Sequence, residues 1–157
     1  MLTKYLLIFL VSMVPLIELR GAVFMAVGMD LPYWTSLIVC VIGNMLPVPV
    51  IYFFARKVLL WGKDKKYIGK FFTFCLEKGE KAGQALTRKA GRGGLFIALL
   101  LFVGIPLPGT GAWTGTLGAS FLNMGFKSTV ISVCLGVILA GFIMGLASTG
   151  VFSMIGI

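Results

Sequence analysis

Two charged residues lie close together inside an apolar segment near the start of the chain. Glu18 and Arg20 belong to the stretch 15–21 (PLIELRG), and residues 5–29 contain no other charge. Two charges at a bilayer centre cost about 5–7 kcal/mol, and the apolar residues around them return roughly 4–8 kcal/mol. The segment can therefore enter a membrane with a net free energy near zero. A charge pair retained under that condition indicates a functional site.

The chemistry open to this pair is proton or ion handling. Glu18 could carry a proton and release it when the site opens to water, or it could bind a cationic substrate. Arg20 stays charged and could neutralise Glu18 or hold an anion such as a phosphate headgroup. A fixed ion pair that only pins the fold is the structural alternative. Asn44 would offer a donor and an acceptor to the same cavity, or it would hydrogen-bond between helices.

A second candidate stretch follows the middle of the chain, at residues 104–118 (GIPLPGTGAWTGTLG). Its backbone amides could form an anion-binding nest or the N-terminus of a half-helix, and the alternative is a tight structural turn. It is not a P-loop, because no lysine follows it. The predicted binding residues of this stretch are Pro108, Gly109, Thr110, Gly111 and Trp113.

Both stretches interrupt apolar segments with proline and glycine, which predicts a break between two short helical limbs. The first break separates limbs at residues 5–14 and 21–29. Ten residues of helix cover about 15 Å, half of a hydrocarbon core of about 30 Å. Residues 5–29 therefore form either a re-entrant hairpin with the charges at its tip or one tilted, broken span, and length alone does not choose.

The chain contains this pattern twice. Residues 95–103 and 112–122 flank the second break, and each break is followed by a full apolar span, at residues 35–55 and 128–152. The breaks begin with Pro-Leu pairs that lie 91 residues apart, at Pro15 and Pro106. If each half is a hairpin plus one span, the halves insert upside down to each other. Such inverted repeats are typical of secondary transporters.

Composition predicts an all-α integral membrane protein. Of the 157 residues, 59% are hydrophobic and 12% charged, and the mean hydropathy is +1.02. These values exclude an ordinary soluble domain. We expect one membrane domain over residues 1–157, with repeat 1 at 5–55, a connector at 56–92 and repeat 2 at 93–155.

The connector carries most of the positive charge. Eleven of the fourteen basic residues lie between Arg56 and Arg92. By the positive-inside rule this predicts a multi-pass protein of the inner (cytoplasmic) membrane with the connector in the cytoplasm. Helical spacing of apolar residues predicts an amphipathic helix at about 65–81, lying on the membrane and facing anionic lipids. Because the charge is not spread over a soluble face, nucleic acid is not an expected partner.

Other chemistry finds little support. The chain has no histidine, which excludes a histidine relay, a Ser-His-Asp triad and a His-ligated metal. The three cysteines are far apart and lack a CxxC pair. We therefore expect no metal, no cofactor and no enzyme activity, because no nucleophile and base can be assembled.

At these motifs the chain resembles a known family. The stretches 15–21 and 104–115, together with residues 43–49 (GNMLPVP), are similar to the small multidrug export protein family of prokaryotes. The likeness covers essentially the whole chain and implies two re-entrant hairpins in an inverted arrangement. That family is related to the DedA (VTT-domain) superfamily, which is associated with moving polyprenyl-phosphate and other lipids. Members of that superfamily usually carry arginines in the second hairpin, and residues 95–126 here contain none.

The expected function is therefore transport, driven by protons or ions, of a small cationic or lipid-like substrate. Glu18 would be the responsive group, and residues 109–113 would form the opposing half of the site. A lipid translocase or scramblase that depends on Arg20 is the alternative, and a non-transporting membrane scaffold is the third. Membrane lipids are expected partners, and a homodimer is compatible with the sequence.

Overall fold

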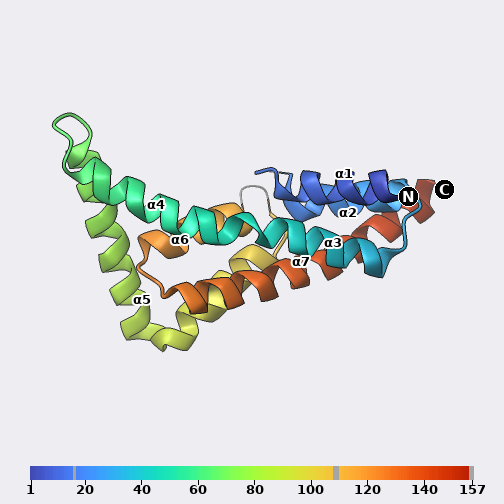
Figure 1. Ribbon diagram of the computed structural model, residues 1–157. Coiled ribbons are helices and arrows are strands. Elements are labelled where there is room, and N and C mark those ends of the chain that lie inside the picture. Colours follow the sequence, from blue (N-terminus) through green and yellow to red (C-terminus); the bar gives the residue numbers. More distant parts are fainter. Residues whose placement is uncertain (16, 108–109, 156–157) are drawn as a thin grey trace.

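The computed structural model describes residues 1–15, 17–107 and 110–155. Seven helices and no strand occur within these residues, which confirms the all-α prediction (Figure 1). The helices are α1 (Leu2–Met13), α2 (Glu18–Gly28), α3 (Tyr33–Met45), α4 (Pro47–Lys63), α5 (Gly69–Gly104), α6 (Ala112–Phe121) and α7 (Phe126–Ile155).

Two helical hairpins enter the molecule from opposite ends. Helices α1 and α2 form one hairpin, and the end of α5 forms the other with α6 (Figure 1). Their turns meet near the middle of the long axis, at the breaks that proline and glycine predict. Three of the four limbs, α1, α2 and α6, begin and end within three residues of the predicted bounds. The limb predicted at 95–103 is instead the last part of α5, which begins at Gly69. Helices α1 and α2 pack against each other as a helical hairpin (Figure 1).

Helices α2 and α6 have the same kind of C-terminal cap. After α2, Asp30 has φ 57° and the Leu31 N–H donates to the Ala26 carbonyl at 3.0 Å. After α6, Asn123 has φ 55° and the Met124 N–H donates to Ala119, again at 3.0 Å. Short polar residues tolerate this left-handed conformation, which ends a helix and satisfies its last carbonyls. Asn123 follows Asp30 by 93 residues, and α7 begins 93 residues after α3.

Two long apolar stretches run the length of the bundle beside the hairpins. The helices at Tyr33–Lys63 and Phe126–Gly150 are long and apolar enough to cross a membrane. The first is broken at Leu46, between α3 and α4, where Pro47 and Pro49 have no N–H to offer the preceding turn. The second is uninterrupted. Figure 1 shows that α3–α4 and α7 run in opposite directions.

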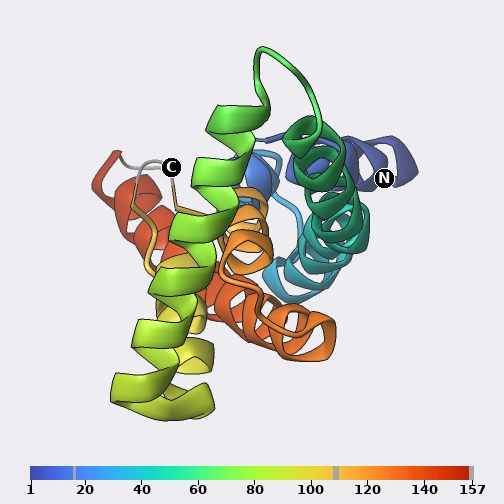
Figure 2. The ribbon, with the colours of Figure 1, turned by 90° about the vertical axis from the view of Figure 1, so that its left-hand side faces the viewer.

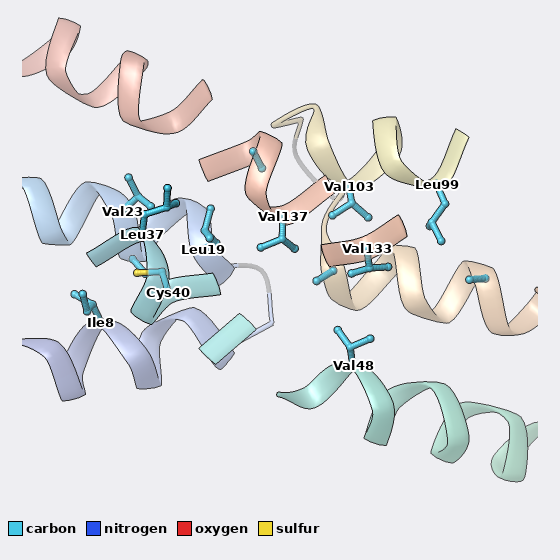
Figure 3. Close-up of a cluster of buried hydrophobic side chains, with 14 of the residues drawn as sticks. Ile8, Leu19, Val23, Leu37, Cys40, Val48, Leu99, Val103, Val133 and Val137 are labelled. Atoms are coloured by element: carbon cyan, nitrogen blue, oxygen red, sulfur yellow. The ribbon is translucent and has the colours of Figure 1, made fainter. Parts of the chain in front are cut away.

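Buried side chains pack on both sides of the meeting hairpin tips (Figure 3). Close approach of the helices depends on α7 glycines. A Cβ at Gly141 would lie 2.3 Å from Leu37 of α3, and one at Gly136 would lie 2.8 Å from the Leu100 carbonyl of α5. The GxxxG face at 141–145 is thus a packing surface against α3, as its spacing indicates.

The basic connector differs from its predicted shape. Helix α4 continues past residue 55 to Lys63, and α5 begins only at Gly69 and continues to Gly104 with a kink at Gly91, where φ is 71°. The first part of α5 lies across one end of the bundle, which Figure 2 views end-on. The amphipathic helix predicted at about 65–81 is therefore part of a longer helix that continues into the second hairpin.

Candidate functional site

Glu18 of the first hairpin touches the second hairpin. It is the first residue of α2 and only 6% exposed. Its Oε1 accepts a hydrogen bond from the Trp113 backbone N–H at 3.1 Å, and its Oε2 accepts one from the Ala112 N–H at 3.2 Å. Both donors belong to the first turn of α6, where backbone N–H groups lack helical partners and the helix dipole is positive. The carboxylate of one hairpin thus caps the helix of the other.

Two backbone features make this contact fit. A Cβ on Gly111 would lie 2.0 Å from Oε2 of Glu18, so only glycine leaves room for the carboxylate. Glu18 itself has φ 51°, a left-handed conformation that costs an L-residue about 1–2 kcal/mol. Strained residues of this kind cluster at ligand and switch sites.

Arg20 reaches the same hairpin on the other side of its turn. Its guanidinium donates to the Leu107 carbonyl, to the Ile105 carbonyl at 3.3 Å and to the Thr110 hydroxyl oxygen at 2.8 Å. Ile105 follows the last residue of α5, where carbonyls are unpaired and the helix dipole is negative. The cation therefore caps the C-terminal end of one limb of the second hairpin, and the anion caps the N-terminal end of the other.

Trp113 of the second hairpin also donates a side-chain hydrogen bond to the first hairpin. Its indole Nε1–H donates to the Met13 carbonyl at 3.1 Å, at the C-terminal end of α1. Each hairpin thus offers a side chain to the exposed helix end of the other. All side-chain hydrogen-bond partners that the structure gives for Glu18 and Arg20 lie on the second hairpin. Each of the two side chains therefore forms its own bridge between the hairpins.

Asn44 lies on a different element. It is 2% exposed, near the end of α3 and two residues before the break at Leu46. Its Oδ1 is buried and has no hydrogen-bond partner among the described residues, and the same is true of the Ser36 hydroxyl on α3. A buried orphan carbonyl oxygen is costly, by about 1–3 kcal/mol, so Asn44 holds an unused acceptor close to a helix break.

Most of the predicted site is brought together. Glu18, Arg20, Thr110, Gly111 and Trp113 form one contact network, whereas Asn44 makes no hydrogen bond to it. Pro108 and Gly109 lie outside the described residues. The residues that sequence reasoning missed take part through backbone groups, which give no side-chain signal. They are Met13, Ile105, Leu107 and Ala112.

The arrangement can hold charge but has no metal-binding cluster. Within the described part of the chain, no group of three or more His, Cys, Asp or Glu residues could hold a metal ion. The polar groups that meet at the tips are a carboxylate, a guanidinium, a hydroxyl, an indole N–H and three helix ends. Such a set suits the exchange of a proton or a small ion, because every partner is an uncharged group that another ligand can replace.

No curated protein matches the chain. No solved structure matches it either. Residues 18–143, which include Glu18, Arg20 and the whole of α6, match the family described as "Putative small multi-drug export protein". The chain, with its two apolar helices that could span a membrane, therefore belongs to the small multidrug export protein family.

Proposed function

We propose that this protein is a multi-pass transporter of the inner membrane, in which opening and closing of the two hairpins expose Glu18 alternately. The observation that carries the proposal is the capture of the Glu18 carboxylate by the α6 backbone of the other hairpin. A relation to the DedA superfamily is part of this proposal.

The lengths of the hairpin limbs support re-entrant hairpins. Helices α1, α2 and α6 contain 12, 11 and 10 residues. At 1.5 Å per residue they are about 15–18 Å long, half of the hydrocarbon core. A hairpin of such limbs reaches the middle of the bilayer and returns to its own side. The two tips then meet at the midplane, which is where secondary transporters bind their substrates.

The recurring helix ends support an inverted repeat. The matched caps at Asp30 and Asn123, and the matched starts of α3 and α7, share a spacing of 93 residues. The two Pro-Leu pairs lie 91 residues apart in the sequence. The spacing of the helix ends is therefore two residues longer than the spacing of these pairs. The first half (α1–α2, then α3) and the second half (end of α5, α6, then α7) enter from opposite ends, as two inverted copies would (Figure 1).

The distribution of charge supports the orientation. The connector between α4 and α5 lies at the end of the molecule away from both termini (Figure 1). Lys127, at the start of α7, lies near the outer end of the second hairpin, on the connector side. The positive-inside rule places that end in the cytoplasm and both termini outside.

Glu18 is the responsive group in this mechanism. When the hairpins separate, its carboxylate loses two backbone donors and takes up a proton or a cationic substrate from the opened side. When they close, the α6 N-terminus replaces that ligand and releases it. Arg20 keeps the second hairpin aligned through Thr110 and the carbonyls of the turn. Asn44 contributes its unused acceptor to the opened cavity.

Reconstitution into proteoliposomes tests the proposal. We expect uptake of a lipophilic cationic dye, driven by an imposed pH gradient, in vesicles that contain the wild-type protein. Glu18→Gln, which keeps the shape and one acceptor, should abolish uptake at unchanged protein level. Unchanged uptake by this variant would refute the role of Glu18. Movement of a fluorescent anionic phospholipid between leaflets, without dye uptake, would instead identify a lipid translocase that depends on Arg20. Full function in a Glu18/Arg20 charge swap would identify a scaffold.

A further inference from the structure

The connection between α4 and α5 carries an open hollow lined by lysines. Lys63 at the end of α4, Lys65 and Lys66 in the connection, and Lys70 in the first turn of α5 surround a volume of about 420 Å³. Gly69, Thr73, Phe74 and a single acid, Glu77, complete the lining. The hollow therefore has a strongly positive wall.

The backbone holds these lysines in a fixed arrangement. The Gly69 N–H donates to the Lys65 carbonyl at 2.8 Å, and the Lys65 N–H donates to Gly62 at 3.1 Å. A Cβ on Gly69 would lie 2.6 Å from the Lys63 carbonyl, and one on Gly62 would lie 2.7 Å from the Phe72 ring. Glycine at both positions lets the two helices close tightly. The lysine side chains are therefore gathered by the fold rather than spread along a flexible loop.

A second observation points to an anion. The hollow lies at the N-terminal end of α5, where the positive end of the helix dipole favours negative charge. Lysines and a helix N-terminus together are the usual partners of a phosphate group. Lys65 also lies 4.4 Å from the Trp61 ring centroid, which restricts its position.

Exposed aromatic side chains occur in the same segment as the hollow. Phe74 lines it, and the Trp61 ring lies beside Lys65. Trp61, Tyr67, Phe71 and Phe74 are 60%, 94%, 66% and 58% exposed. Aromatic rings of this kind sit at the headgroup level of a membrane, and lysines beside them meet the phosphates of its surface. A soluble anion would use the lysines but would leave the apolar rings in water. A lipid uses both.

We propose that the hollow at Lys63, Lys65, Lys66 and Lys70 is a binding site for the phosphate headgroup of an anionic phospholipid, with its glycerol and acyl chains against the exposed rings. The site anchors the α4–α5 connection to the membrane surface. The site shares no residue with the hairpin tips, so this proposal does not depend on whether the protein is a transporter.

The test measures lipid-dependent stabilisation of the purified full chain in a neutral detergent. We expect phosphatidylglycerol to raise the unfolding temperature more than phosphatidylcholine at equal mole fraction, and added salt to reduce the difference. The double variant Lys66→Gln/Lys70→Gln should bind phosphatidylglycerol about 30-fold more weakly, because each lysine near the surface contributes about 1 kcal/mol and 1.4 kcal/mol is tenfold. Lys66→Arg/Lys70→Arg should retain most of the binding.

The matched control is Arg88→Gln/Lys89→Gln. These exposed residues lie on α5 about 27 Å further along the helix from Lys70, and the charge change is the same. We expect less than a threefold change in affinity. Equal loss in both double variants would overturn the site in favour of a diffuse basic field. Equal stabilisation by phosphatidylcholine, or by soluble glycerol phosphate, would overturn the lipid assignment.

Discussion

The Glu18 carboxylate and the Trp113 backbone N–H, 95 positions apart in the chain, are joined at 3.1 Å across the meeting point of two hairpins. The bond links the start of α2 to the start of α6. A free N–H group in the first turn of α6 is thus satisfied by a side chain of the other hairpin. A charge that is costly in an apolar segment is thereby held by partial charges of the backbone, which move with the second hairpin. Any separation of the hairpins would therefore break both backbone hydrogen bonds to Glu18 and expose the carboxylate.

Gly111→Ala should destabilise the closed arrangement. The new Cβ would lie 2.0 Å from Oε2 and 2.6 Å from Cδ of Glu18, so the carboxylate must leave the α6 N-terminus. Loss of hydrogen bonds to a charged group costs about 1.5–3 kcal/mol each, and we expect a lower unfolding temperature in detergent. Gly118→Ala on the same helix is the control, because nothing lies within 4 Å of its Cβ. It should be neutral or slightly stabilising. Equal behaviour of the two variants would contradict the contact.

Arg20 and Thr110 should be energetically coupled. The guanidinium donates to the threonine hydroxyl at 2.8 Å and to two carbonyls of the same turn. In a double-mutant cycle with Arg20→Met and Thr110→Val, we expect a coupling free energy of about 1 kcal/mol in thermal or chemical unfolding. Arg20→Lys should also destabilise, since a lysine cannot serve three acceptors in a fixed plane. Additive effects of the two substitutions would show that the bridge does not hold the hairpins together.

The sequence predicts the breaks well because proline and glycine act locally. It places three of the four limbs within three residues, but it misses the start of the fourth, which is the end of a helix that begins at Gly69. Five of the eight predicted site residues lie in the contacts between the hairpins. The end of α4 was predicted too early, because the basic residues after Ala55 are good helix formers and nothing stops the helix before Lys63. The sequence also indicates that backbone amides of the second break could hold an anion opposite Glu18. It does not show which two amides bind the carboxylate, or that Glu18 has a left-handed φ, because neither feature leaves a trace in residue type.

Replacing Asn44 should reduce transport without reducing the stability of the protein. Its buried Oδ1 has no partner among the described residues, so Asn44→Leu removes an unsatisfied acceptor at similar volume. We expect the unfolding temperature to be unchanged or higher, and transport to fall if the acceptor serves the opened cavity. Ser36→Ala is the control, because its hydroxyl is equally orphaned on α3. It should leave transport unchanged. A clear loss of stability in Asn44→Leu would show that the amide has a structural partner.

A methyl group added at different glycines of α7 should destabilise the protein by different amounts. A Cβ at Gly136 meets the Leu100 backbone carbonyl at 2.8 Å, whereas one at Gly141 meets only the tip of the Leu37 side chain. A side chain can rotate away and a backbone cannot, so Gly136→Ala should destabilise more than Gly141→Ala, by about 1 kcal/mol or more. Unfolding temperatures of the two purified variants measure the order. The reverse order would show that α5 and α7 can separate freely.

The proposed topology can be tested through the two ends of the chain. Both lie at the end of the molecule opposite the basic connector (Figure 1), so re-entrant hairpins place residue 2 outside and Lys127 inside. Four full spans would instead place both termini in the cytoplasm. Single cysteines at Leu2 and at Lys127, in a background where the native cysteines are alanine, can be labelled in intact cells with an impermeant maleimide. We expect labelling at residue 2 before lysis and at residue 127 only after lysis. Because the hairpin tips meet only if each hairpin returns to its own side, labelling of residue 2 solely after lysis would remove the basis for a midplane site.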